Sequence, residues 1–302
     1  MRLPILFRAT LLSALLLSAI EAWADLGPKQ ARKLIANMAG FELSRSAVRV
    51  NGMSKTGDSS AEVNAEIEIP FRLGQDQLGR WRVAEIRTGP NQWEGTELIA
   101  NALKADMPSN ACNASAIVAT GADAKDPSVT RARCLIASLF SVQLPSDAVR
   151  IKDLSSLNPP LASNPSALVV AVARVEVRFV NDNKTGWHVS ALRTGSSQWL
   201  NLEKVISAVN EEKKRRARAD LEAIARALEA YRTERGMYLA TDKHPVLMDH
   251  LTPRYLSRVI RLDPWHRPYR YQGESSHFLL RSPGPDGKEN TADDIVLASP
   301  SR

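Results

Sequence analysis

The sequence predicts an α+β protein, in which two tandem units, each a helix plus an antiparallel sheet, precede a small α+β domain. Three observations support this prediction. Residues of the first two thirds recur at a nearly fixed spacing, and in each copy helical apolar spacing gives way to strand-like alternation. The last third has a long amphipathic pattern, short strand patterns and a Gly- and Pro-rich loop.

The first 24 residues are typical of an export signal. Arg2 and Arg8 precede an apolar stretch from Ala9 to Ile20, and Ala22-Trp23-Ala24 has the A-x-A form of a cleavage site. The apolar stretch is shorter than the ~20 residues that span a bilayer. We expect cleavage after Ala24 and a periplasmic or secreted protein. An uncleaved anchor is the alternative, and the only membrane contact we expect.

The composition excludes some functional classes. The chain is 44% hydrophobic, so it has material for globular cores, and its net charge is +7. Residues 1–24 contain two arginines and one glutamate, which leaves +6 after cleavage. Export argues against a nucleic-acid partner for this modestly basic protein.

The repeat rests on strings that recur along the chain. Leu34-Ile35-Ala36 returns as Leu135-Ile136-Ala137, at a spacing of 101. The string R-T-G-x-x-Q-W occurs at Arg87–Trp93 and again at Arg193–Trp199, at a spacing of 106. The difference is a five-residue insertion, which a surface loop absorbs at little cost. The chain then divides into a signal peptide (1–24), first unit (25–108), linker (109–128), second unit (129–212) and C-terminal domain (213–302).

Within each unit a helix precedes strands and a closing helix follows them. We expect strands at Glu62–Ile69, Trp81–Arg87, Ala167–Val180 and Trp187–Arg193, and closing helices at Glu94–Lys104 and Leu200–Glu212. A cystatin-like and a nuclear-transport-factor-2-like arrangement both fit this order.

The shared side chains of the two R-T-G-x-x-Q-W strings have two interpretations. Arg87, Trp93, Arg193 and Trp199 could anchor a partner surface. The favoured interpretation is structural: the glycine turns the strand into the helix and the tryptophan covers the core. Duplicated units keep what the fold requires more readily than what one site requires.

Two further features bear on stability. Cys112 and Cys134 are the only cysteines, and an oxidising compartment favours a disulfide between them over one buried and one exposed thiol. The charged run from Glu211 to Arg218 is interpreted as a solvated helix face, with a patch for anionic lipid as the alternative. The helix there is either continuous or broken near Lys213.

The end of the chain contains a candidate metal site. Asp286, Asp293 and Asp294 lie within nine residues of a loop too rich in Gly and Pro to be helical. Carboxylates brought together repel one another unless a cation joins them, and Ca²⁺ accepts six to eight oxygen ligands in irregular geometry. A calcium site and a solvated acidic turn both remain open on this chemistry alone.

Three motifs of this region occur in the order found in one family. They are Tyr231-Arg232-Thr233-Glu234-Arg235-Gly236-Met237-Tyr238, then Asp263-Pro264-Trp265 with Pro268-Tyr269, then Ser282-x-Gly284-x-Asp286-Gly287 with Thr291-x-Asp293-Asp294-Ile295. Together they resemble the C-terminal domain of the type II secretion major pseudopilin. The resemblance implies a structural calcium ion held by the side chains of Asp286, Asp293 and Asp294, with the carbonyls of Pro283 and Thr291 nearby.

The resemblance covers about residues 215–297 and has departures. His266 and Arg267 replace the usual Gly and Asn, and Asn290 replaces a Gly. The family's long apolar helix enters its domain directly, whereas here two units come first, so we do not expect this chain to polymerise like a pilus subunit.

The sequence therefore predicts a non-enzymatic envelope protein that binds or scaffolds a protein partner, linked to secretion or pilus-like machinery. We find no nucleophile-elbow, zinc-protease, P-loop or Rossmann motif. Two alternatives stay open: a small-ligand binder or enzyme with a pocket in each unit, and a purely structural protein.

Overall fold

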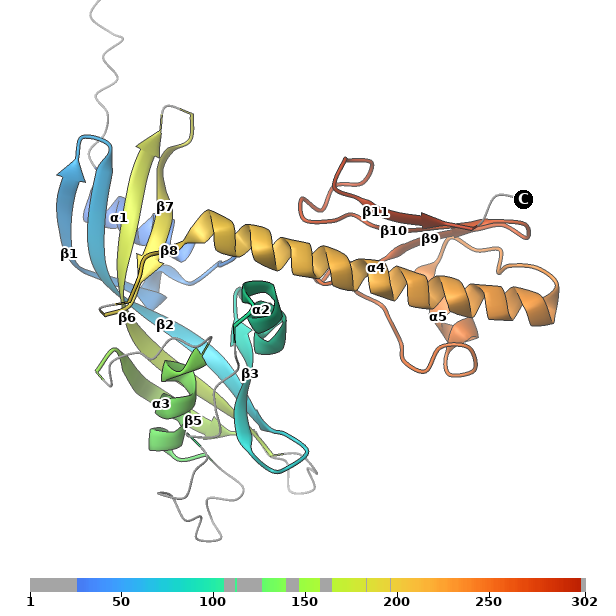
Figure 1. Ribbon diagram of the computed structural model, residues 1–302, viewed down its shortest axis with the longest axis horizontal. Helices are drawn as coiled ribbons and strands as arrows, with labels where there is room; N and C mark the ends of the chain where they lie inside the picture. The colour runs from blue at the N-terminus through green and yellow to red at the C-terminus, as the bar shows by residue number, and fades with distance from the viewer. Residues whose placement is uncertain are drawn as a thin grey trace, which may run out of the picture.

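The computed structural model describes residues 26–105, 112, 127–139, 147–157, 165–182, 184–195 and 197–299. Figure 1 shows a large twisted sheet and its short helices at one end of the molecule and a small domain at the other end. The long helix α4 (Leu202–Arg235) joins them. The predicted α+β class is confirmed. The predicted signal segment, and the predicted linker apart from Cys112 and its last two residues, lie outside the described residues.

The same order of elements occurs in both units. The first unit contains α1 (Pro28–Ala36), η1 (Arg45–Ala47), β1 (Val48–Gly57), β2 (Ser60–Gln75), β3 (Trp81–Arg87), β4 (Trp93–Gly95) and α2 (Thr96–Leu103). The second contains α3 (Val129–Ala137), β5 (Val149–Ser156), β6 (Ser166–Asp182), β7 (Gly186–Arg193) and β8 (Leu200–Asn201), followed by α4. The sequence analysis missed β1 and β5, because both strands are mostly exposed and lack regular alternation.

The two units are not separate bodies in tandem, which corrects the predicted arrangement. β2 pairs with β6 in antiparallel register, from Ser60 opposite Val180 to Gly74 opposite Ser166. All eight strands therefore form one sheet, in the order β4-β3-β2-β6-β7-β8, with β1 beside β2 and β5 beside β6. A single unit would leave the inner edge of its longest strand unpaired, and this pairing satisfies both edges.

The register of the sheet is the same in both units. Val48 pairs with Ile67, and Val149 pairs with Ala173 at the equivalent positions. Ile67 also pairs with Ala173 across the β2–β6 contact, so the two equivalent residues face each other at the centre of the sheet. This local two-fold relationship supports the internal repeat, whose origin by duplication stays a prediction.

Each of the two cores under the sheet draws residues from both units. The odd-numbered residues of β2 share one face, and α1 and α3 both pack on it. The core beneath α1 combines β1 and the first half of β2 with Val177 and Phe179 of β6. The core beneath α3 combines β5 and the first half of β6 with Phe71 and Leu73 of β2. Neither core is complete without the other unit.

The C-terminal domain is built on the second half of α4. One face of this helix packs against α5 (His244–Leu251) and against a sheet of order β11-β10-β9, formed by β9 (Arg270–Gly273), β10 (Phe278–Ser282) and β11 (Ile295–Ala298). Gly236 caps α4 with φ 78°. The helix is continuous through residues 212 and 213. No helix in the described ranges combines the length and hydropathy needed to cross a bilayer.

Candidate metal centre

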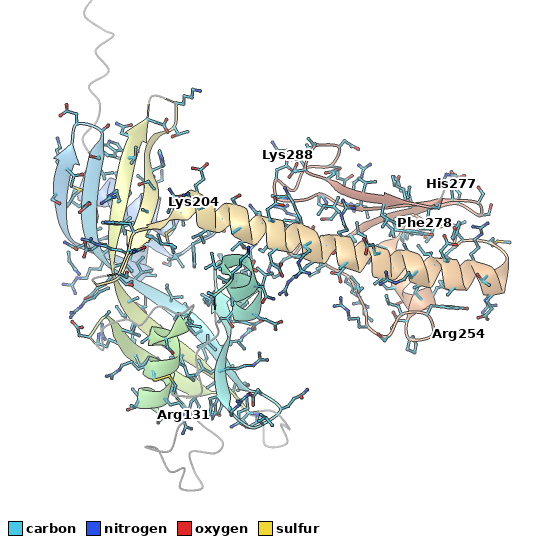
Figure 2. The ribbon with its side chains drawn as sticks, viewed as in Figure 1. Arg131, Lys204, Arg254, His277, Phe278 and Lys288 are labelled. Carbon is cyan, nitrogen blue, oxygen red and sulfur yellow. A yellow bond between two sulfur atoms is a disulfide. The ribbon has the colours of Figure 1, made fainter. Side chains whose placement is uncertain are left out.

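The acidic loop, residues 283–294, connects β10 to β11 at the end of the small sheet that faces the large sheet. Figure 2 shows Lys288 of this loop above α4, whereas His277 marks the opposite end of the small sheet. Gly284, Gly287 and Asn290 have positive φ angles of 63°, 69° and 67°. Asparagine tolerates the left-handed conformation better than most residues, so Asn290 keeps the backbone that a glycine would adopt.

Hydrogen bonds hold two of the predicted carboxylate ligands against the loop backbone. Asp293 Oδ2 accepts from the backbone N–H of Asp286 at 3.0 Å, and its Oδ1 accepts from the hydroxyl of Thr291 at 2.6 Å. Asp286 Oδ1 accepts from the backbone N–H of Lys288 at 2.8 Å. The Thr291 and Asp286 bonds, with the nearby charge of Lys214, hold the pKa of Asp293 below its usual range, so this carboxylate is ionised at neutral pH.

The third predicted ligand has an oxygen without a partner. The Asp294 side chain is 6% exposed, and its Oδ2 accepts from the backbone N–H of Asn290 at 2.9 Å and lies 3.6 Å from Arg281 Nε. Its buried Oδ1 has no hydrogen-bond partner. A buried carboxylate oxygen that lacks a donor is costly, and a bound cation would satisfy it.

Gly284 allows the loop to fold tightly. A Cβ at Gly284 would lie 2.3 Å from the carbonyl oxygen of Asp293, so only glycine lets the two sides of the loop meet. The two predicted carbonyl ligands are those of Thr291 and Pro283. The Thr291 carbonyl accepts from the Asp294 N–H at 3.3 Å. Pro283 is buried at the start of the loop.

The donor set fits calcium in kind, because it consists of carboxylate and carbonyl oxygens around an unsatisfied Asp294 oxygen. Within the described residues, however, no three acidic, histidine or cysteine side chains converge closely enough to hold an ion as they stand. The structure thus brings Asp286 and Asp293 together through Thr291 and places Asp294 beside them. Calcium binding stays a prediction.

The four residues of the predicted partner surface make contacts within the large sheet. Arg87 Nε donates to the carbonyl of Gly89 at 3.0 Å. Trp93 lies under the guanidinium of Arg72, with the Arg72 Cζ 4.1 Å from the ring centroid. Arg193 pairs with Glu176 at 2.5 Å. Arg178 and Arg193 lie 4.1 and 4.6 Å from the ring of Trp199. These contacts support the structural interpretation, and the role in partner binding stays a prediction.

The structure joins Cys112 to Cys134 in a disulfide that ties residue 112 to α3. Cys112 is 6% exposed and belongs to the core beneath α3.

The charged run on α4, residues 211–218, was predicted to be a solvated helix face, but two of its charged residues are buried. Glu212 and Lys213 are 8% and 7% exposed. Glu212 accepts from Arg215 and Arg216 at 2.7 and 2.8 Å, while Lys213 contacts Glu94 of the first unit. Trp265 Nε1 donates to Asn210 of α4 at 3.0 Å. Sequence analysis missed this junction because its partners are distant in the chain.

Two clefts lie at equivalent positions in the units, where β1 or β5 begins and β3 or β7 ends. The first, about 630 Å³, is lined by residues that include Glu68, Lys152 and Arg87, and the second, about 360 Å³, by residues that include Arg174 and Glu176. Lys152 pairs with Glu68, and Arg174 pairs with Asp147 at 3.3 Å. Glu68, Lys152 and Arg174 are therefore engaged in ion pairs, while Arg87 bonds to the carbonyl of Gly89.

Residues 204–298 match the family model described as type II secretion system (T2SS), protein G. The match covers the C-terminal domain with nearly all of α4, and confirms that this domain resembles the major pseudopilin. It supports a protein of the cell envelope that is related to type II secretion. No curated protein and no solved structure matches the chain.

Proposed function

We propose that this protein is a non-enzymatic binding or scaffold component of the cell envelope, which engages secretion or pilus-like machinery through a calcium-stabilised C-terminal domain. The observation that carries the proposal is the course of α4. The helix that supports the pseudopilin-like domain begins at Leu202 on the large sheet and runs unbroken to Arg235. The C-terminal domain is therefore attached to the large sheet through α4, and the large sheet is the part that binds a protein partner.

Calcium would be held by the carboxylates of Asp286, Asp293 and Asp294, with the carbonyls of Pro283 and Thr291 nearby. The ion would supply positive charge to the unsatisfied Asp294 oxygen and tie the two sides of the loop together. Because the loop connects β10 to β11, the ion would stabilise the small sheet. The role is structural, and no step of chemistry is assigned to the ion.

The calcium part is tested by thermal unfolding of the full mature chain in calcium and in a chelator. An ion that binds only the folded domain raises the midpoint by mass action. The variant carrying Asp293→Ala and Asp294→Ala should lose this increase. The matched control is Asp249→Ala, which removes an exposed carboxylate from α5 of the same domain. Equal midpoints of the wild-type chain in calcium and chelator would exclude the stabilising ion.

The partner part is tested by capture from envelope extracts on the immobilised mature chain, in calcium and in chelator. Enrichment of secretion or pilus proteins that is lost in the Asp293→Ala, Asp294→Ala variant supports docking through the C-terminal domain. If such proteins are enriched in neither condition, the docking proposal is wrong.

A further inference from the structure

Arg267 occupies a fixed position beside the acidic loop. The carboxylate of Asp263, 3% exposed, accepts from the backbone N–H groups of Trp265 and Arg267, each at 2.9 Å. The other oxygen of Asp263 accepts from the hydroxyl of Ser282 at 2.6 Å, and this hydroxyl also lies 3.3 Å from the backbone N of Gly284. These bonds tie the turn that carries Arg267 to the end of β10, where the loop begins.

The guanidinium of Arg267 binds the loop backbone directly. Its Nη1 donates to the carbonyl of Gly284 at 2.6 Å, and both Nη atoms lie 3.4 Å from the carbonyl of Pro285. A Cβ at Gly287 would lie 2.3 Å from the Arg267 Cζ, so the guanidinium rests against this glycine. Charge-assisted bonds to carbonyls are about twice as strong as neutral ones.

Other cations of the chain neutralise the loop at its edges. Arg281 lies 3.6 Å from Asp294 and donates to Asn290 Oδ1 at 2.5 Å, and Arg270 pairs with Glu289 at 2.7 Å. Of these arginines, Arg267 is the one whose bonds go to the carbonyls of the loop itself.

We propose that Arg267 is a positioning residue that supplies a tethered cation to the acidic loop, so that the loop is ordered before calcium binds. Calcium then adds to a conformation that already exists. Only this last step rests on the proposed function, because the ordering by Arg267 requires no metal.

The test is hydrogen exchange of the full mature chain in chelator, with amides of residues 284–294 as the readout. We expect the wild-type loop to be protected, and Arg267→Ala to raise its exchange at least tenfold in chelator. Calcium chloride in excess should recover part of the protection if the proposed calcium site is correct. Arg267→Lys keeps the charge but not the planar fork, and should give an intermediate rate. Arg254→Ala, which breaks an exposed pair with Glu234, is the control and should leave the loop unchanged.

The outcomes separate this proposal from the proposed function. Loop protection in chelator that is unchanged in Arg267→Ala overturns the role of Arg267. A wild-type loop that is protected only in calcium also overturns it, while supporting the calcium site. Loss of protection in Arg267→Ala without any calcium effect supports Arg267 and overturns the calcium site. If Arg267→Ala also loses protection in β10, Arg267→Lys decides: loop exchange in Arg267→Lys as fast as in Arg267→Ala, with β10 still protected, would contradict the proposal.

Discussion

Lys213 Nζ of α4 lies 2.5 Å from Glu94 Oε1 of β4, across 119 residues of chain. The two side chains are only 9% and 12% exposed. His266 of the C-terminal domain places its Nε2 3.3 Å from the same oxygen, and does so with a left-handed backbone at φ 64°. Glu94 of the first unit therefore contacts both Lys213 of α4 and His266 of the C-terminal domain, and joins the three parts at one point.

Removing one charge of this pair should destabilise the protein strongly. In Glu94→Gln the ammonium of Lys213 stays buried without a compensating charge, and such changes cost about 3–5 kcal/mol. We expect a fall of about 3 kcal/mol in the free energy of unfolding, measured by urea denaturation at pH 7.

The control for this prediction is a pair on the same helix that is exposed. Glu211 and Lys214 lie 3.0 Å apart with side chains 69% and 37% exposed, so Glu211→Gln should cost less than ~1 kcal/mol. The double variant Glu94→Gln, Lys213→Met removes the buried charge and should recover much of the loss. Equal effects of Glu94→Gln and Glu211→Gln would show that the junction contributes nothing.

His244 should make the C-terminal domain sensitive to acid. Burial, followed by the charge of Arg261, lowers the pKa of His244 to about 4, and its Nε2 has no hydrogen-bond partner. The unfolded chain, with a histidine pKa of about 6.5, binds this proton more readily than the folded one. The free energy of unfolding is therefore unaffected by protonation of His244 above pH ~6.5. It falls as the pH decreases toward ~4, by up to about 3 kcal/mol.

Urea denaturation at several pH values between ~4 and ~7 measures this acid loss. His244→Leu removes the titrating group, and its stability should change less over that range than that of the wild-type chain. His277→Gln, at an exposed histidine, should retain the full wild-type loss. An identical acid loss in His244→Leu would show that other groups cause it.

The disulfide should stabilise the core beneath α3. It joins residues 22 apart in sequence, and a loop of this length corresponds to about 3 kcal/mol in the loop-entropy account. Cys112→Ser with Cys134→Ser should lower the free energy of unfolding by that amount. Reductant should lower the wild-type midpoint equally and leave the double variant unchanged. A wild-type midpoint that reductant does not alter would contradict a closed disulfide.

The sequence predicted features that depend on local chemistry. The long strand β6 is one of them, because it is determined by residues close in the chain. Sequence patterns could not show that Lys213 meets Glu94, because a charge run looks the same whether it faces water or a distant carboxylate. The β2–β6 pairing was missed for the same reason, since a strand pattern does not name its neighbour.

The acidic loop shows the same difference between local and long-range features. The carboxylates and glycines of the acidic loop were found from spacing, because all of them lie in one short segment. Arg267 was noticed only as a departure from the pseudopilin pattern. Its bond to the Gly284 carbonyl depends on the fold that brings residues 17 apart together.

The shared sheet predicts that the first unit cannot fold alone. A fragment of residues 26–105 keeps α1 but lacks Val177 and Phe179, which complete its core. The fragment could replace β6 only by pairing β2 with the β2 of a second copy about Ile67. That register would set Glu66 opposite Glu68 of the second copy, whereas in the intact chain Glu66 faces Arg174. Like charges directly opposite are destabilising, so the fragment should be neither a folded monomer nor a stable dimer.

Circular dichroism and size-exclusion chromatography of the fragment check this prediction. Adding a second fragment, residues 127–302, should restore strand signal and produce a one-to-one complex, because it supplies β6 and β7. Glu66→Lys removes the repulsion in the self-paired register and should promote a dimer of the first fragment. The same substitution should weaken the complex with the second fragment, because it sets a cation opposite Arg174. A 26–105 fragment that unfolds cooperatively as a monomer would show that the two units are independent, and that their pairing follows folding instead of enabling it.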